Sequence, residues 1–385
     1  MHRGRRAFVV VMDACGIGAL PDAGDYGDAG TNTLAHVAER AGGLEVPTLA
    51  SLGLGTICPL AGVAPSARPA VHGRLHPLGP GKDSTTGHWE LMGASVPHAP
   101  VYPDGFPPDV IAAFERATGR RVVCNAAVEG LQAIEKHGEH HLRTGDLIVY
   151  TSQDSVFQVA AHTGVVPEVE LYEHCRAARA ILAGPHAVSR VIARPFEGTP
   201  GGFRRTAGRR DFALAPPART YLDELRDRGV DVHSVGKVSD LFGGHGFSHN
   251  HGGADNATAI EILDRLEAEL DEGFVFANLI DTDQLYGHRK DVSGFARALA
   301  TIDAAVARWL AARRPGDLIV VTADHGCDPA HPGTDHTREY APLVATFDGA
   351  PSARVDGPLA RVGATVLRWL AGLDSALPGE PFVSA

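Results

Sequence analysis

Short apolar runs alternate with amphipathic stretches along most of the chain. The runs are apolar at nearly every position, which is typical of strands covered on both faces. They span residues 8–12, 147–151, 188–193, 230–235, 274–280, 318–322 and 343–346. Helical periodicity lies between them at residues 33–41, 167–182, 220–228, 256–270, 292–313 and 358–373. This alternation predicts an α/β fold with a largely parallel sheet flanked by helices.

Composition divides this pattern into parts. Predicted loops are rich in Gly, Ser and Thr at residues 79–87, in Gly, Pro and Arg at 195–210, and in Gly and His at 243–253. Aspartates and histidines gather in residues 12–88 and 278–336, whereas the middle of the chain holds arginines but no dense Asp/His cluster. We therefore expect a core domain made of residues 1–96 and 214–385, with an α+β cap domain, residues 97–213, inserted between its two parts.

The charge and cysteine content narrow the classes of partner. The net charge is −11, and no long run of Lys or Arg occurs, so nucleic acid is not an expected partner. No apolar run has the length of a membrane span, and the first one ends at Asp13, too early for a signal peptide. The five cysteines are scattered and include no Cys-x-x-Cys pair, which predicts reduced thiols in the cytoplasm. The pattern predicts no particular oligomeric state.

Carboxylates and imidazoles follow directly on predicted strands, at the edge where open α/β sheets bind ligands. A single aspartate there would be a helix cap or a turn residue, but the whole set predicts metal binding. Mixed oxygen and nitrogen ligation suits divalent ions such as Mn or Zn. Two such ions beside three carboxylates keep about one positive charge, which favours a phosphate dianion. The residues are Asp13, Asp283, His288, Asp324, His325 and His336.

Three adjacent hydroxyls offer a nucleophile. They belong to Ser84, Thr85 and Thr86 in the segment Gly-Lys-Asp-Ser-Thr-Thr-Gly-His-Trp-Glu at residues 81–90. A hydroxyl needs a metal or a base to become nucleophilic, and a helix N-terminus would stabilise phosphate on its oxygen. A Ser/Thr helix cap is the simpler alternative, and only the neighbouring metal set favours catalysis.

Arginines in the middle of the chain could bind phosphate through a bidentate fork. Taken alone, each of these arginines would more often belong to a solvated basic loop than to a phosphate site. They are Arg190, Arg194, Arg204, Arg205, Arg209 and Arg210.

Together these motifs resemble the phosphopentomutases, a branch of the alkaline phosphatase superfamily, over essentially the whole chain. The resemblance rests on Val-Val-Met-Asp ending at Asp13, on residues 81–90, on Val-Tyr-Thr-Ser-Gln-Asp-Ser-Val at 149–156, on Arg-Val-Ile-Ala-Arg-Pro-Phe at 190–196, on Thr-Ala-Asp-His-Gly at 322–326 and on residues 331–340. It implies an alkaline-phosphatase-like core with an inserted cap that binds the substrate phosphate. It also implies two metal ions, which in this family are usually manganese.

The resemblance also implies individual roles. Ser84, where the family usually has threonine, would be the nucleophile and a ligand of the first ion. The remaining ligands would be Asp13, Asp324 and His325 for the first ion and Asp283, His288 and His336 for the second. Cap residues for the pentose phosphate would be Ser152, Asp154, Val156, Arg190 and Arg205.

The implied reaction interconverts the 1- and 5-phosphates of ribose or deoxyribose. Phosphate on Ser84 would pass to the substrate, give ribose 1,5-bisphosphate and return, and a sugar bisphosphate would prime the enzyme. Closure of the cap would exclude water. A metal-dependent phosphatase or a cofactor-independent phosphoglycerate mutase is the alternative enzyme, and a non-catalytic metal-binding protein is the alternative of another class.

Overall fold

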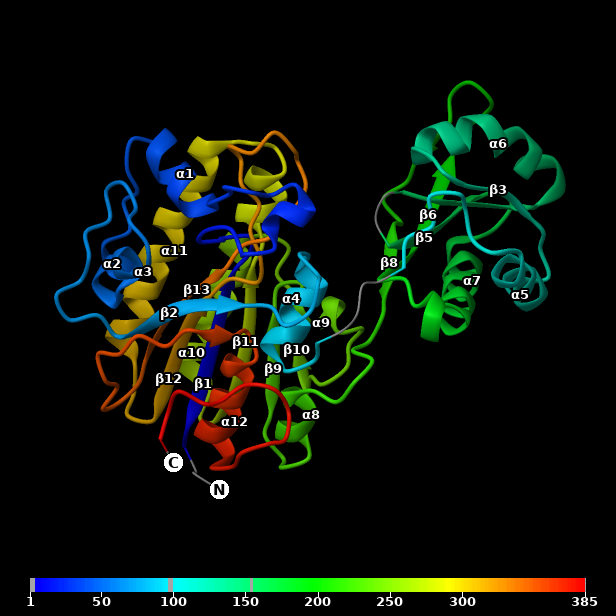
Figure 1. Cartoon of the computed structure of the whole chain (residues 1–385). Helices are drawn as coiled ribbons and strands as arrows, with labels where there is room; N and C mark the ends of the chain where they lie inside the picture. The colour runs from blue at the N-terminus through cyan, green and yellow to red at the C-terminus, as the bar shows by residue number, and fades with distance from the viewer. Residues whose placement is uncertain (1–3, 96–99, 153–154, 385) are drawn as a thin grey trace. The chain divides into compact units, whose positions relative to one another are not determined.

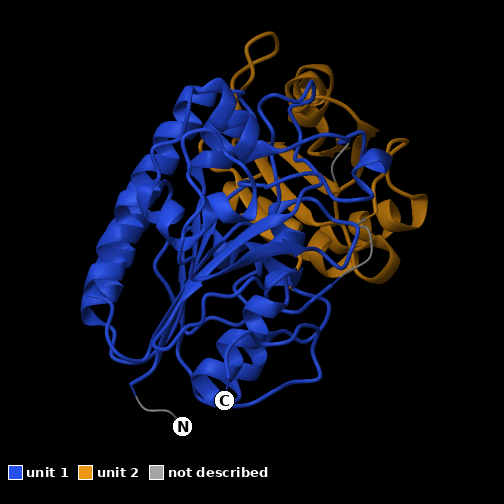
Figure 2. Ribbon diagram, turned by 60° about the vertical axis from the view of Figure 1, so that its left-hand side comes forward, with its two compact units in different colours: residues 1–97, 216–385 blue, residues 98–215 orange. Residues whose placement is uncertain are grey.

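The computed structural model describes residues 4–95, 100–152 and 155–384. The chain forms two compact units, coloured separately in Figure 2. Residues 1–97 and 216–385 make up one, here named the core unit, and residues 98–215 make up the other, named the inserted unit. The inserted unit therefore interrupts the core unit in sequence.

The core unit is built on an eight-stranded sheet with the order β10-β9-β11-β1-β12-β13-β2-β14. Five neighbouring strands, from β10 to β12, run parallel, and β13 is antiparallel to both of its neighbours. Every residue of β1 and β11 is buried, which explains their continuous apolar runs. The predicted α/β fold with a largely parallel sheet is thus confirmed. The strands are β1 (Arg6–Met12), β2 (Val71–His76), β9 (Val232–Val235), β10 (His249–Asn250), β11 (Gly273–Leu279), β12 (Asp317–Thr322), β13 (Ala341–Thr346) and β14 (Gly357–Pro358).

Helices cover both faces of this sheet (Figure 1). Helix α12 packs on β1, β11 and β12, whereas α10 packs on β9, β11 and its neighbour α11. The helices are α1 (Thr33–Arg40), α2 (Pro47–Leu52), α3 (Leu54–Ile57), α4 (Ser84–Leu91), α8 (Tyr221–Arg226), α9 (Val238–Leu241), α10 (Asn256–Glu269), α11 (Val292–Ala312) and α12 (Arg361–Ala371), with a 3₁₀ turn at Ala23–Tyr26 and a π-helix at Thr282–Gly287.

The predicted loop at residues 79–87 is too long, because α4 begins inside it. Asp83 caps the helix: its Oδ1 accepts hydrogen bonds from the amides of Thr85 at 2.9 Å and Thr86 at 3.1 Å. The Thr86 hydroxyl donates to the other Asp83 oxygen at 2.9 Å. Gly87 therefore lies within the helix, where a Cβ would stand 2.5 Å from the backbone oxygen of Asp324. The glycine lets α4 approach the end of β12.

The inserted unit has a six-stranded mixed sheet in which β3, β4, β5, β6 and β7 follow one another and β8 pairs with β6. Its strands are β3 (Val122–Ala127), β4 (Leu147–Thr151), β5 (Val156–His162), β6 (Arg190–Glu197), β7 (Arg204–Arg205) and β8 (Arg210–Ala213). Its helices are α5 (Pro108–Thr118), α6 (Gly130–Thr144) and α7 (Glu168–Ile181), with a 3₁₀ turn at Gly184–His186.

Alternate residues of these strands enter two separate hydrophobic clusters. Leu147 and Val149 pack with residues of α5 and α7, while Ile148 and Tyr150 pack with residues of α6. Because successive strand residues point to opposite faces, α5 and α7 cover one face of the sheet and α6 covers the other.

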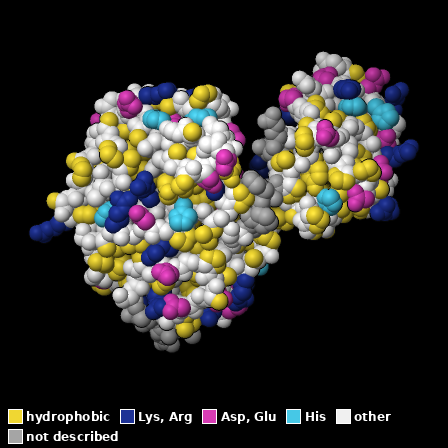
Figure 3. Space-filling view, viewed as in Figure 1, with side chains coloured by type: hydrophobic (Ala, Val, Ile, Leu, Met, Phe, Trp, Pro, Cys, Tyr) yellow, Lys and Arg dark blue, Asp and Glu magenta, His cyan; other side chains and the backbone are white. Residues whose placement is uncertain are grey.

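Charged side chains of both signs are interspersed on the face shown in Figure 3. Within the described part of the chain, each helix is too short or too polar to traverse a bilayer.

Candidate active site

Three neighbouring strands of the core unit end at the same edge of the sheet, and the predicted metal ligands follow them. Met12 pairs with Leu279 and Val11 with Thr322, so the ends of β1, β11 and β12 lie side by side. Asp13 continues β1, Asp283 follows β11, and Asp324 and His325 follow β12. All four side chains are buried.

Asp13, Asp324 and His325 form one possible ligand set, in which a ligand atom from each lies within 4.8 Å of the others. His325 Nε2 is 3.4 Å from Asp13 Oδ1 and 3.4 Å from Asp324 Oδ2. The Ser84 hydroxyl, at the first position of α4, lies 3.1 Å from His325 Nε2 and 3.4 Å from Asp13 Oδ1. The structure thus brings the candidate nucleophile into the first predicted ligand group.

Asp283, His288 and His336 gather beside it. The π-helix places Asp283 and His288 on one side, because the His288 amide donates to the Asp283 carbonyl five residues earlier, at 3.2 Å. Asp283 Oδ1 is 3.4 Å from His288 Nε2 and 3.3 Å from His336 Nε2. The ring of His336 also lies 4.1 Å from that of His325, so the two groups are adjacent.

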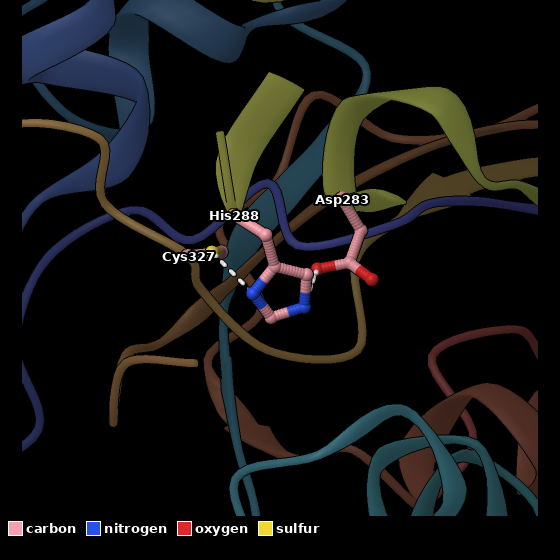
Figure 4. Close-up of side chains that lie close together, drawn as sticks. All are labelled: Asp283, His288 and Cys327. Atoms are coloured by element: carbon pink, nitrogen blue, oxygen red, sulfur yellow. Dashed lines mark hydrogen bonds and ion pairs between the residues drawn. The ribbon is translucent and has the colours of Figure 1, made fainter. Parts of the chain in front are cut away.

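Cys327, which was not among the predicted ligands, lies next to the second group. With Asp283 and His288 it forms one possible ligand set, and Asp283, His325 and His336 form a further one. Its Sγ is 3.9 Å from His288 Nδ1, and Figure 4 shows the His288 ring between this sulfur and the Asp283 carboxylate.

The unpaired polar atoms of this region fit divalent cations. Asp324 Oδ2, Asp283 Oδ1 and His336 Nε2 are buried and have no hydrogen-bond partner. Leaving buried polar atoms without hydrogen bonds is costly, and two carboxylate oxygens and one imidazole nitrogen do so here. Carboxylate oxygens with imidazole nitrogens form a donor set for Mn, Zn or a similar ion. The residues therefore suit a metal centre.

The pKa values reflect the negative potential of the centre. Burial opposes a charge on His325, but the carboxylates of Asp324 and Asp13 outweigh it and raise the His325 pKa to about 10. Burial would likewise raise the pKa of Asp13, yet Lys237 and His325 hold it well below its usual value. The site thus favours positive charge at its centre.

Lys237 is a functional candidate that the sequence analysis missed. Its Nζ lies 2.6 Å from Asp13 Oδ2 and donates a hydrogen bond to the Ser84 hydroxyl at 3.0 Å. Burial lowers its pKa, but Asp13 and Asp283 reverse this, so the Lys237 pKa is raised and the amine stays charged. Lys237 follows β9 shortly after its end, so the strand-end rule that found the aspartates could have found it.

Asn278 and His88 hold Asp13 and Ser84 in place through hydrogen bonds. The Asn278 amide nitrogen is 2.9 Å from Asp13 Oδ2 and 3.2 Å from His88 Nε2. An amide NH₂ only donates, so His88 Nε2 accepts and its Nδ1–H donates to the Ser84 carbonyl at 2.8 Å. This chain fixes both the Asp13 carboxylate and the first turn of α4.

The loop before Ser84 is held from two sides. Glu90, in the last turn of α4, accepts hydrogen bonds from the amides of Leu78 and Gly79, the latter at 2.7 Å. Arg338, which is buried, donates to the carbonyls of Gly79 at 2.9 Å and Gly81 at 2.7 Å. Since Arg338 lies two residues after His336, it ties the nucleophile loop to a segment that carries a candidate metal ligand.

The substrate residues predicted for the cap share a pocket within the inserted unit. Ser152, Val156, Arg190 and Arg205 line a cavity of about 440 Å³. The fifth predicted residue, Asp154, lies outside the described residues. The lining also includes Arg194 and Arg209, which the sequence indicates as possible phosphate-binding arginines, and Glu129, Tyr150 and Gln158, which were not predicted.

Comparisons with known proteins agree over the whole chain. The family model of the metalloenzyme superfamily matches residues 5–371. The phosphopentomutase of Symbiobacterium thermophilum is 49% identical over 386 residues, 98% of each chain. That of Acetivibrio thermocellus is 45% identical over 386 residues, 99% of each chain. Among solved structures, the phosphoglycerate mutase of Leishmania mexicana superposes with a TM-score of 0.50 at 15% identity, covering 99% of this chain and 97% of that one. This structural likeness concerns the fold alone.

Proposed function

This chain belongs to the phosphopentomutases, and we propose that it moves phosphate between positions 1 and 5 of ribose or deoxyribose through a phosphorylated Ser84 and a ribose 1,5-bisphosphate intermediate. The observation that carries this proposal is the contact of the Ser84 hydroxyl with Asp13, His325 and Lys237. A serine that only capped a helix would not need a buried carboxylate, an imidazole and an ammonium around its oxygen.

Ser84 is a better candidate than its neighbours. The Thr86 hydroxyl takes part in the capping box with Asp83, and among the described residues the Thr85 hydroxyl has no hydrogen bond to a predicted metal ligand. The Ser84 oxygen alone of the three has the predicted ligands as partners. This geometry supports Ser84 as the phosphorylated residue.

We assign Asp13, Asp324, His325 and Ser84 to one divalent ion and Asp283, His288 and His336 to a second, with manganese expected from the family. When bound, the ions would lower the pKa of the Ser84 hydroxyl and offset the charge of the phosphoryl group. Lys237 supplies a further positive charge beside the same oxygen. The unpaired oxygens of Asp283 and Asp324 support this assignment.

In the proposed cycle, the phosphorylated Ser84 transfers its phosphoryl group to the 5-hydroxyl of ribose 1-phosphate. The bond from phosphorus to the Ser84 oxygen breaks as the bond to the sugar oxygen forms, and the proton of the 5-hydroxyl passes overall to the Ser84 oxygen; in the return step the Ser84 proton passes to the sugar oxygen at position 1. The bisphosphate then returns its 1-phosphate to Ser84 and ribose 5-phosphate departs. Positioning and charge compensation account for this catalysis, and a sugar bisphosphate restores the phosphoenzyme after an accidental loss.

The substrate phosphate that does not react is assigned to the pocket of the inserted unit. Arg190 and Arg205 provide the charge, and Ser152, Val156 and Asp154 complete the predicted set. The scattered cysteines, all free, support a cytoplasmic location for the reaction.

One incubation tests the function. The manganese-loaded protein is given ribose 1-phosphate with a trace of ribose 1,5-bisphosphate, and ribose 5-phosphate and inorganic phosphate are measured together. A mutase forms ribose 5-phosphate with little inorganic phosphate. Stoichiometric release of inorganic phosphate would instead indicate a phosphatase, and turnover of phosphoglycerate but not of pentose phosphate in a substrate panel would reject the pentose assignment.

A further inference from the structure

The floor of the pocket in the inserted unit is formed by adjacent strands at one level. Gln158 on β5 pairs with Tyr150 on β4 and with Ile192 on β6. Arg190 and Arg194 lie two residues to either side of Ile192, so all three point to the same face of the sheet. This face is the one that α6 covers, and the pocket opens beside the first residue of that helix, Gly130.

Four arginines line this pocket, but three of them already contact carboxylates. Arg205 Nη2 lies 3.1 Å from Glu129 Oε1. Arg209 holds Asp211 through two hydrogen bonds of 2.8 Å. Arg190 Nη1 is 3.6 Å from the same carboxylate.

Arg194 differs from the other three. Its Nε donates to the side-chain oxygen of Gln158 at 3.0 Å. Among the residues that the structure describes, no carboxylate lies within ion-pair distance of its guanidinium. Gln158 is itself buried, so a fixed polar side chain orients Arg194, and no described carboxylate forms an ion pair with it.

Glu129 occupies a position suited to a bound anion. One of its oxygens accepts the amides of Leu131 at 2.7 Å and Gln132 at 3.0 Å, in the first turn of α6. The other oxygen faces Arg205. Burial would raise the Glu129 pKa, but these amides and Arg205 lower it overall. The Glu129 carboxylate thus already binds Arg205 and the N-terminus of α6, two groups of this pocket that could bind an anion.

We propose that Arg194 is the principal receptor of the sugar phosphate in this pocket, and that Glu129 competes with that phosphate for Arg205. The proposal rests on the proposed function and adds a ranking to its binding residues. The ligand class is a phosphate monoester dianion on a pentose. Arg194 gains a complete charge-assisted contact when phosphate binds, whereas Arg205 only exchanges one anion for another.

The test is a titration with ribose 5-phosphate, followed by calorimetry, on manganese-loaded protein that carries Ser84→Ala to prevent turnover. Adding Arg194→Met should raise the dissociation constant about tenfold to a hundredfold, the range for a hydrogen bond to a charged group. Adding Glu129→Gln, which keeps a helix-capping oxygen, should lower it about two- to fivefold. Arg204→Met is the matched control: Arg204 is exposed, pairs with Glu197 at 3.0 Å and does not line the pocket.

Each outcome has a distinct meaning. If the parent protein fails to bind ribose 5-phosphate, the proposed function itself is wrong. If the parent binds and Arg194→Met binds equally well, or no worse than Arg204→Met, the role of Arg194 is rejected while the function stands. If Glu129→Gln weakens binding, Glu129 is not a competitor. Should Arg194→Met fail to fold, Arg194→Lys keeps the charge but loses the fork, and an unchanged dissociation constant for it overturns the proposal.

Discussion

The candidate metal site of the core unit and the pocket of the inserted unit differ in burial and in pairing, although we propose that both bind phosphate. In the core unit, Asp13, Asp324 and Asp283 are 0%, 4% and 5% exposed, and one oxygen each of Asp324 and Asp283 has no hydrogen-bond partner. In the inserted unit, the side chains of Arg190 and Arg205 are 39% and 33% exposed and already contact carboxylates.

The comparison separates fixed from adjustable binding. The edge of the sheet holds the core residues in one arrangement, and bound cations would neutralise their net negative charge. The pocket arginines exchange partners in contact with solvent, where ion pairs are weak. We therefore expect all-or-none effects from changes in the core site and graded effects from changes in the pocket.

The largest effect is expected from Ser84→Ala. Removing the hydroxyl that accepts phosphate should lower kcat at least about a thousandfold. Metal content, measured by elemental analysis, should stay near that of the parent, since the aspartates and histidines remain. Thr85→Ser is the control and should keep most of the activity. Full activity of Ser84→Ala in the coupled ribose 5-phosphate assay would remove Ser84 from the mechanism.

A second large effect is expected on stability when the cations are removed. Manganese at about a hundred times its dissociation constant should raise the free energy of unfolding by about 2.7 kcal/mol for each site. Chelation should reverse this gain, which thermal unfolding with and without manganese would measure.

Asp324→Asn distinguishes metal binding from simple packing in the same experiment. The variant loses a carboxylate oxygen of the candidate ligand set, and its stability without manganese serves as the reference for its response to the ion. With manganese it should lose most of the gain from one site. An equal response of the variant and the parent to manganese would place the ion elsewhere.

Arg338→Lys probes how firmly the core site fixes its nucleophile. Lysine retains the charge beside Asp22, which Arg338 holds at 2.8 Å. Its single ammonium nitrogen replaces three guanidinium nitrogens, so it cannot reproduce the fork that bonds Asp22 and the Gly79 and Gly81 carbonyls together. A shift of the Ser84 loop should lower kcat about ten- to a hundredfold, with KM for ribose 1-phosphate changed less than about twofold. A parallel rise in KM, or an unchanged kcat, contradicts the positioning role. Arg308→Lys, at an exposed pair with Asp264, serves as control.

The sequence predicted those parts of the site that repeat a simple pattern. Asp13 and Asp324 end long apolar runs, so their places at the sheet edge followed from strand order. Lys237 follows β9 and could have been found by the same rule. Asn278 and His88 gave no such signal, because each is a single polar residue within a strand or a helix. Their role depends on contacts between segments far apart in sequence.

The residue composition of some segments led to wrong predictions of helices and strands. Residues 79–87 read as a loop because Gly, Ser and Thr dominate, but Asp83 caps the backbone and starts α4 within them. In the inserted unit, α6 was not predicted, since its His and Gly residues, such as Gly138, blur the helical period. Strand β5 was also missed, although its apolar run is buried in the sheet.

The smallest effect is expected from Cys327→Ser, which decides between two arrangements of the second metal site. His288 Nδ1 is 2.7 Å from the carbonyl of Thr334; a carbonyl only accepts, so Nδ1 carries the proton and Nε2 is the free donor atom. Nε2 faces Asp283 at 3.4 Å, whereas Cys327 Sγ lies 3.9 Å from Nδ1. The ion should therefore bind among Asp283, His288 and His336. Cys327→Ser should change the manganese dependence of activity less than about twofold. His336→Ala should weaken manganese binding at least about tenfold, because even the loss of an outer partner of a metal ligand costs about that much. The reverse order in a manganese titration would assign the sulfur to the site.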